Sequence, residues 1–220
     1  ASLAQAMEKD FRALLQARLN ESKEQTKGVS ADRTFAGAWK GLKLATADDM
    51  EAAVDTTVAE KAFLSIAKTI TSLPTDKKFF GKIEKLFDER KKMVETQNFD
   101  WAVAEQMAYG TLVKDGFRVR LSGQDVERGT FSHRHAVLKL ENSEEEFVPL
   151  AQLGEGLATF EVYNSHLSEY GVLGFEYGYA LANPQCLTIW EAQFGDFFNG
   201  AQIIVDQFIA SAETKWQRSN

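Results

Sequence analysis

The chain has 220 residues, enough for one medium domain or for one domain with an extension. Hydrophobic residues make up 44% and charged residues 26%, which is typical of a globular protein and argues against disorder. The formal net charge of −7 disfavours binding to a nucleic-acid backbone, and a single cysteine, Cys186, excludes an internal disulfide and a cysteine-rich zinc site. No apolar run is long enough for a membrane span, and the first residues lack the pattern of a secretory signal. We therefore expect a soluble, intracellular protein with neither nucleic acid nor membrane as a partner.

Charge and aromatic residues are distributed unevenly along the chain. Residues 1–98 carry 17 basic and 15 acidic side chains, whereas residues 99–220 carry 8 basic and 17 acidic ones. The second part also holds 18 of the 25 aromatic residues. This shift predicts two units, with a boundary near residue 98.

The first unit is predicted to be a helical arm. Apolar residues at three- and four-residue spacing indicate helices over residues 3–15, about 50–74 and 79–97. Asp48 or Asp49 is the candidate cap of the second helix. Residues 21–41 are polar with scattered Gly and Ser, and Trp39 is their one candidate anchor.

The second unit alternates between predicted helices and strands. Helices are expected over residues 99–115, 167–181 and 196–215, and strands over residues 117–121, 135–140, 159–163 and 187–190. The acidic run 144–146 is expected to be a solvated turn, and Gly116 is expected to follow the end of the first of these helices. This order predicts an α/β fold with a parallel sheet flanked by helices.

Several chemical motifs are missing from the sequence. There is no P-loop, nucleophile elbow or HExxH pattern, and Gly154-Glu155-Gly156 lacks the third glycine of a dinucleotide fingerprint. His133 and His135 are two residues apart, so on a strand both would face one side, as metal ligands can. Because no third ligand is near in sequence, hydrogen bonding or ion pairing is the favoured role for them, and we assign no metal ligand.

Three features carry more information. The loop 122–130 follows a predicted strand directly, and ligands bind at such loops in open α/β sheets, although an ordinary connection has the same pattern. Glu169 is expected in the first turn of a helix, where it either complements the helix dipole or, buried beside Tyr170 and Phe175, has a raised pKa and shares a proton with a nitrogen base. Glycines at 171, 174 and 178 in one predicted helix indicate a close approach of another backbone, from a partner helix or from the chain's own sheet.

Three stretches strongly resemble a known family. Residues 99–137, 162–184 and 187–216, including RGTFSHRHAV and WEAQFGDF, are similar to the E1 components of 2-oxoglutarate dehydrogenase, which depend on thiamin diphosphate. The resemblance is dense from about Phe99 to Trp216 and weaker from about Trp39 to Glu95.

The resemblance implies a truncated, transketolase-like pyrimidine-binding domain over residues 99–220, preceded by a helical arm over residues 1–98. Glu169 matches the glutamate that hydrogen-bonds N1′ of the cofactor's pyrimidine ring and so promotes loss of the thiazolium C2 proton. Phe194 matches a position that packs on the pyrimidine, with Gln193 beside it. Gln124 and Asp125 match a strand-end loop near the cofactor at the dimer interface.

For the whole protein, the resemblance implies oxidative decarboxylation of 2-oxoglutarate in the citric acid cycle, with transfer of the succinyl group to the lipoyl domain of an E2 succinyltransferase. It also implies a homodimer in the bacterial cytoplasm or the mitochondrial matrix. The GDG…N pattern that binds Mg²⁺ and the diphosphate is not among these residues, so we expect a fragment that is inactive alone and Mg²⁺ ligands outside it. Two alternatives stay open: a 2-oxoadipate dehydrogenase E1, and a non-catalytic dimerisation or docking module.

Overall fold

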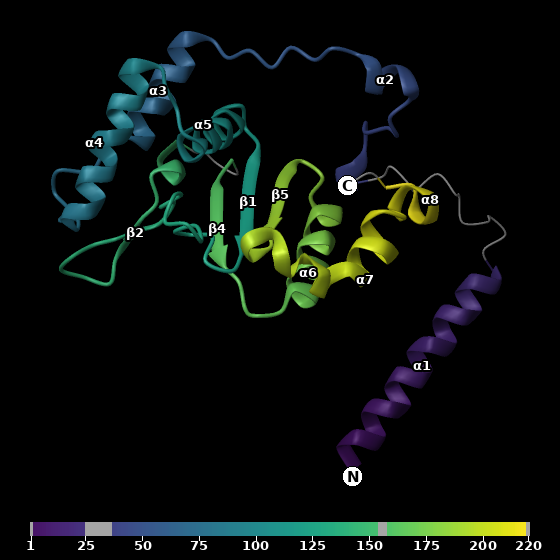
Figure 1. Cartoon of the computed structure of the whole chain (residues 1–220). Coiled ribbons are helices and arrows are strands. Elements are labelled where there is room, and N and C mark those ends of the chain that lie inside the picture. Colours follow the sequence, from purple (N-terminus) through teal and green to yellow (C-terminus); the bar gives the residue numbers. More distant parts are fainter. Residues whose placement is uncertain (1, 25–36, 154–157, 219–220) are drawn as a thin grey trace. The chain divides into compact units, whose positions relative to one another are not determined.

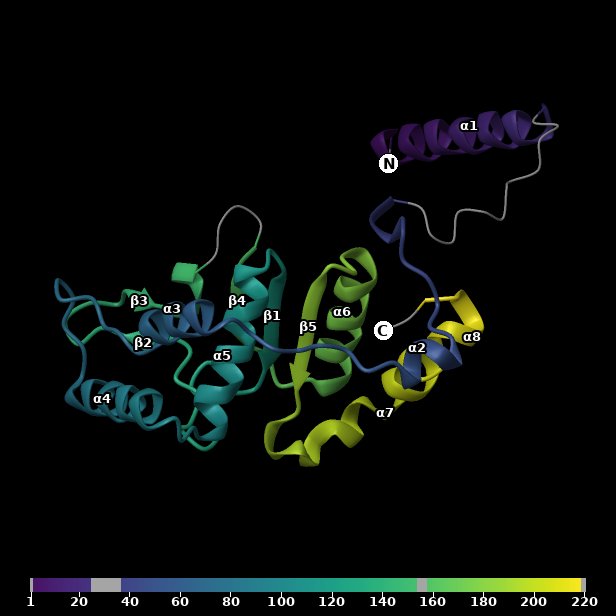
Figure 2. The ribbon, with the colours of Figure 1, turned by 90° about the horizontal axis from the view of Figure 1, so that it is seen from above.

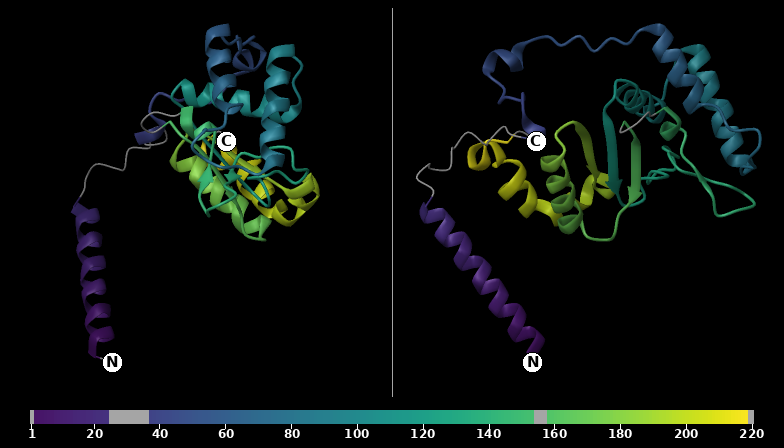
Figure 3. Two further views of the ribbon diagram at one scale, coloured as in Figure 1. Left: turned by 90° about the vertical axis from the view of Figure 1, so that its left-hand side faces the viewer. Right: turned by 180° about the vertical axis from the view of Figure 1, so that it is seen from behind.

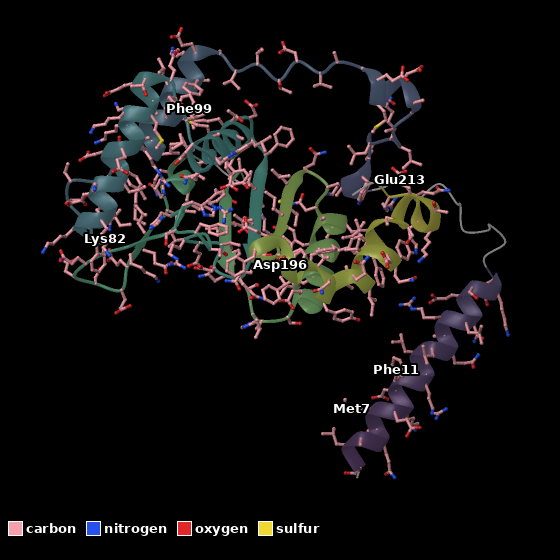
Figure 4. All side chains as sticks on the ribbon, in the orientation of Figure 1. Met7, Phe11, Lys82, Phe99, Asp196 and Glu213 are labelled. Atoms are coloured by element: carbon pink, nitrogen blue, oxygen red, sulfur yellow. The ribbon has the colours of Figure 1, made fainter. Side chains whose placement is uncertain are left out.

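A computed structural model of the chain describes residues 2–24, 37–153 and 158–218 (Figure 1). The chain divides into two compact units, residues 1–42 and 43–220. The first contains helix α1 (Ser2–Glu24), whose apolar stripe is exposed, with Met7 and Phe11 labelled in Figure 4. It also contains the short helix η1 (Gly37–Trp39), in which Trp39 is buried, as expected of an anchor. The rest of the polar segment, residues 25–36, lies outside the described residues.

Two helices replace the single helix predicted over residues 50–74. Helix α2 (Ala47–Glu51) begins after Thr46, whose side chain and that of Asp49 form a capping box, so the cap is not an aspartate. The C-cap residue Ala52 is already extended, and α3 (Glu60–Ile70) begins only after the following segment. The prediction of one continuous helix was wrong because the segment between them is rich in β-branched residues, which have low helix propensity.

The next two helices were predicted well. Helix α4 covers Gly81–Thr96, and α5 covers Trp101–Lys114. Asp100 caps α5 by accepting a hydrogen bond from the Val103 amide at 2.8 Å. Gly116, just beyond the end of α5, has φ +93°, a backbone conformation that favours glycine.

Three parallel strands form the sheet, as the sequence predicted. They are β1 (Arg118–Gly123), β4 (Phe160–Asn164) and β5 (Cys186–Glu191), and β1 lies between β4 and β5 (Figure 1). In register, the last residue of β1, Gly123, stands opposite Asn164 and Glu191. All three carboxyl ends therefore meet at one edge.

Helices cover both faces of this sheet, which Figure 2 shows from above. Val119 and Leu121 of β1 share the main hydrophobic cluster with residues of α3 and α5. The alternate residues Arg118 and Arg120 bond instead to side chains of α6 (Glu169–Ala182). Because successive side chains of a strand point to opposite faces, α5 and α6 pack on opposite sides of the sheet. Figure 3 gives two further views of these layers.

The predicted boundary near residue 98 falls within one hydrophobic cluster. Ile66 and Ile70 of α3 are buried together with Val103 and Met107 of α5. The packing shows that α3 and α5 contribute to the same hydrophobic cluster. The division into domains 1–98 and 99–220 stays a prediction.

Residues 135–147 depart from the prediction. Of the strand predicted over residues 135–140, only Leu138–Lys139 (β2) is a strand, and it pairs in antiparallel fashion with β3 (Glu146–Phe147). Residue 135 does not belong to a strand because His135 has φ +44°. The predicted turn 144–146 is correct up to its last residue, Glu146, which pairs with Lys139. A short helix, η2 (Leu150–Leu153), follows, and the rejected glycine motif at 154–156 lies outside the described residues.

The long helix predicted over residues 196–215 is broken into short pieces. They are the 3-10 helix η3 (Gln193–Ala201), α7 (Gln202–Ile204), the π-helical turn η4 (Val205–Ile209) and α8 (Ala212–Trp216). The sequence periodicity is the same for a continuous helix and for this series of turns, so it could not distinguish them. Within the described residues, no helix combines the length and the apolar character that crossing a bilayer requires.

Candidate functional site

The candidate site lies at the carboxyl ends of the three parallel strands. Gln124 follows β1, Glu169 begins the helix after β4, and Gln193 lies two residues beyond β5. Gly123 permits this convergence, because a Cβ atom on it would lie 2.3 Å from the Glu191 carbonyl oxygen. The three segments predicted from sequence are therefore neighbours at the sheet edge where α/β proteins bind ligands.

Gln124 and Glu169 are in direct contact. The Gln124 Nε2 atom donates a hydrogen bond to Glu169 Oε1 at 2.7 Å. Glu169 is the first residue of α6, and Ser168 caps that helix by accepting a hydrogen bond from the Gly171 amide at 3.2 Å. The carboxylate thus lies in the first turn of α6, at the positive end of the helix dipole.

The other carboxylate oxygen of Glu169 faces η3. A Cβ atom on Gly200 would lie 3.3 Å from Glu169 Oε2, so a glycine leaves room for that oxygen. Among the described residues, no hydrogen bond is donated to Oε2. One oxygen of Glu169 is therefore fixed by Gln124, and the other can accept a donor from a ligand.

Among the described residues, Tyr170 and Phe175 do not bury Glu169 in the way the sequence predicted. Tyr170 is 52% exposed and Phe175 is 61% exposed, while Glu169 itself is half-buried. The prediction was wrong because these two rings lie off the helix face that is buried, which carries Leu173 and Glu176. Burial among those aromatic residues therefore does not describe the surroundings of Glu169.

Gln193 and Phe194 are the first two residues of η3, where the chain turns sharply after β5, close to Asp196, which Figure 4 labels. Phe194 has φ +57° and Gly195 φ +74°, so the backbone reverses here in the left-handed region. The Phe194 ring is 56% exposed and contacts the Phe131 ring edge-on, with centroids 5.8 Å apart. An exposed ring held by an uncommon backbone conformation is available for stacking on a flat ligand.

Asp125 lies next to Gln124, but its side chain has a different partner. Its carboxylate forms an ion pair with Arg128, three residues further along the same loop. Asp125 also has φ +58°, and its carbonyl oxygen accepts a hydrogen bond from the Gly129 amide at 2.8 Å. The structure therefore assigns Gln124 to the contact with Glu169 and Asp125 to the shape of the loop.

The two histidines do not form a metal site in the described part of the chain. The His133 ring packs on Gly129, where a Cβ atom would lie 2.4 Å from it. No cluster of three or more potential ligands occurs among residues 2–24, 37–153 and 158–218. Burial, together with the positive charges of Arg90 and Arg128, lowers the pKa of His135.

Arg134, between the two histidines, was missed by the sequence analysis. Its side chain is 2% exposed and forms ion pairs with Glu105 of α5 and Glu191 at the end of β5. Nothing local in the sequence signals this role, because an arginine just before a predicted strand is usually a solvated residue. Only the tertiary contacts identify it.

A pocket of about 380 Å³ lies beside the site, between the ends of β1 and β4 and the first turns of α6. Ser122, Asn164 and Ser168 contribute to its lining, and Arg120 and Phe175 lie on its other side. Neither Gln124 nor Glu169 lines it, so the pocket neighbours the carboxylate without containing it.

The fold agrees with the comparison to known protein families. Residues 97–220 match the family described as the transketolase pyrimidine binding domain, and the chain belongs to this family. The chain is also 49% identical over 183 residues to proteins named "2-oxoglutarate dehydrogenase E1 component" from Brucella anthropi, Brucella ovis and Brucella canis. These matches cover 83% of this chain and 18% of each relative, so the chain spans less than a fifth of the length of these relatives.

Proposed function

We propose that residues 97–220 form the pyrimidine-binding part of a thiamin diphosphate-dependent 2-oxoglutarate dehydrogenase E1. The observation that carries the proposal is the hydrogen bond from Gln124 to Glu169, because it orients a carboxylate at the sheet edge and leaves Oε2 without a donor among the described residues. The family match and the names of the relatives support the same reading.

The donor set fits an aminopyrimidine ring. A ring nitrogen that carries a proton needs a carboxylate acceptor, which Glu169 offers, and the ring face needs an aromatic partner, which the exposed Phe194 ring offers. Gln193 is half-buried beside Phe194 and carries an amide that can donate to or accept from a ring substituent. In this proposal, the loop that contains Asp125 forms the remaining side of the binding site for the ring.

In this proposal, bound thiamin diphosphate supplies an electron sink for the loss of carbon dioxide from a 2-oxo acid. Glu169 holds a proton at the pyrimidine N1′ atom, and Gln124 keeps the carboxylate oriented toward that atom. Phe194 stacks on the ring and excludes water from one face. The Mg²⁺ and diphosphate ligands come from residues beyond these 220, because no GDG…N pattern occurs here.

For the whole protein, we propose oxidative decarboxylation of 2-oxoglutarate and transfer of the succinyl group to the lipoyl domain of an E2 partner, by a homodimer. The names of the relatives favour 2-oxoglutarate over 2-oxoadipate, and their bacterial sources favour the cytoplasm over the mitochondrial matrix. A module used only for docking or dimerisation is the alternative from a different class.

The test is Glu169→Gln in the full-length gene product. Decarboxylation of 2-oxoglutarate is measured with thiamin diphosphate, Mg²⁺ and an artificial electron acceptor, with 2-oxoadipate as the parallel substrate. We expect kcat to fall by two or more orders of magnitude, which is about 3 kcal/mol of barrier, because an amide cannot hold the proton as a carboxylate does.

Glu60→Gln is the matched control, since Glu60 is the exposed first residue of α3, as Glu169 is the first residue of α6. It should leave kcat unchanged. Equal activity of Glu169→Gln and wild type would refute the role of Glu169 and favour the docking module. If the wild-type protein turned over 2-oxoadipate and not 2-oxoglutarate, 2-oxoadipate would replace 2-oxoglutarate as the proposed substrate.

A further inference from the structure

We propose that Arg134 is a positioning residue for the pyrimidine site, which it shapes by linking the loop that carries Gln124 to the turn that carries Phe194. This inference rests on the proposed function. The Arg134 side chain donates no hydrogen bond to Glu169 or Gln124 in the described part of the chain, and it acts through Glu191 and the loop backbone.

The guanidinium of Arg134 uses all five of its N–H donors. Nε and Nη2 donate to the two oxygens of Glu105 at 2.8 and 3.0 Å. Nη1 and Nη2 bind the two oxygens of Glu191, with the Nη1 bond at 3.1 Å. Nη1 also donates to the Val126 carbonyl oxygen at 2.9 Å. One side chain therefore joins α5, the loop after β1 and the end of β5 in a fixed planar geometry.

The backbone of Arg134 is anchored as firmly as its side chain. Its carbonyl oxygen accepts hydrogen bonds from Arg90 Nη2 at 2.6 Å and from Gln106 Nε2 at 2.7 Å, and its amide donates to the Arg128 carbonyl oxygen at 2.9 Å. Burial alone would lower the pKa of the guanidinium, but the hydrogen bonds that it donates to Glu105 and Glu191 outweigh burial and raise that pKa. Arg134 is therefore a charged residue whose backbone and side chain are both held in place by hydrogen bonds.

The positions of two of its acceptors, Val126 and Glu191, indicate which segments the Arg134 side chain holds in place. Val126 lies two residues after Gln124, and Glu191 lies three residues before Phe194. In the described part of the chain, the hydrogen bonds that link loop 124–130 to Glu191 outside the sheet all pass through the Arg134 side chain, which donates to Val126 and to Glu191. Phe194 is in the left-handed backbone region, so its ring keeps one orientation only if the residues before it are held.

A pair of matched variants separates positioning from stability. Glu191→Gln and Glu105→Gln each replace one carboxylate that binds the same guanidinium in bidentate fashion, and the two side chains are 33% and 26% exposed. A glutamine keeps the size but offers one acceptor oxygen, so either change breaks one bidentate contact. Only Glu191→Gln breaks the contact between Arg134 and the end of β5, the segment that leads to Phe194.

The measurements are the Kd of thiamin diphosphate in the presence of Mg²⁺, by titration calorimetry on the full-length protein, and urea unfolding of each variant. We expect Glu191→Gln to raise the Kd about ten-fold, equivalent to about 1.4 kcal/mol, and Glu105→Gln to change it less than about two-fold at a comparable loss of stability. Arg134→Lys should raise the Kd at least as much as Glu191→Gln, because an ammonium cannot bridge two carboxylates and a carbonyl in one plane.

Equal Kd values for Glu191→Gln and Glu105→Gln would overturn the inference and leave Arg134 a purely structural residue. Failure of the wild-type protein to bind thiamin diphosphate would refute the proposed function instead. If Arg134→Lys does not fold, the two glutamine variants still decide the question.

Discussion

The ion pair between Arg120 of β1 and Glu176 of α6 should be a major stabilising contact between this sheet and this helix. Arg120 Nε and Nη2 donate to the two carboxylate oxygens at 2.7 and 2.9 Å, and the side chains are 13% and 4% exposed. The hydrogen bonds that Arg120 donates to Glu176 raise the pKa of Arg120. Without Glu176 the guanidinium still stays charged, because the ordinary pKa of arginine lies far above neutral pH. Glu176→Leu therefore leaves a buried, largely unpaired charge.

The expected loss can be worked out from these contacts. Breaking a buried pair on one side costs about 3–5 kcal/mol. Two features of the site soften that loss: Glu161 Oε2 remains 3.6 Å from Arg120 Nη1, and the guanidinium carbon lies 4.7 Å from the Tyr179 ring centroid and 4.8 Å from that of Tyr163. We therefore expect a loss of about 3 kcal/mol in the free energy of unfolding.

Urea unfolding followed by tryptophan fluorescence tests this value. With a slope of about 2 kcal/mol per molar urea, the midpoint of Glu176→Leu should fall by about 1.5 M. The control is Glu141→Leu, which breaks the exposed pair with Lys78 and should cost less than about 1 kcal/mol. The double variant Arg120→Met with Glu176→Leu should regain most of the loss, because no buried charge is left unpaired. The reasoning fails if the single variant loses no more than the control or if the double variant is no more stable than the single one.

Two further predictions follow from local structure. Asp100→Ala removes the cap of α5 and should lower the free energy of unfolding by about 1 kcal/mol in the same urea assay, whereas Asp100→Asn, which can still cap, should lose much less. Because the folded state lowers the pKa of His135, the unfolded chain binds a proton first as the pH falls below about 6.5, and this residue contributes a loss of stability there. An asparagine tolerates the φ of +44° at this position, so His135→Asn should reduce the decrease in stability between pH 7 and pH 5. An unchanged dependence of the urea midpoint on pH across that range would contradict this.

The sequence by itself determined the elements whose signals are local. Gly116 predicted the end of α5, and alternation of short apolar runs with helical segments predicted the parallel α/β layer correctly. Because parallel strands end at one edge, the order of elements also predicted where a site would lie. The residues proposed there, Gln124 and Glu169, do meet at that edge, although their role stays a prediction.

Backbone conformations that depend on distant contacts were beyond the reach of the sequence. His135 and Phe194 adopt positive φ values that the sequence pattern did not signal. A strand was therefore predicted where the chain turns at His135, and the sharp turn at Phe194 was not predicted. The exposure of Tyr170 also depends on which face of α6 is buried against the sheet.

Arg134 shows most clearly what only the tertiary structure decided. Its partners, Glu105 and Glu191, are 29 and 57 residues away in sequence, and they become neighbours only when α5 and β5 pack around the end of β1. Periodicity reports which side of an element is apolar, and caps report where it ends, but neither identifies a partner across such a distance. The pairing depends on the desolvation of a buried guanidinium, which makes five hydrogen bonds necessary and which exists only in the folded chain.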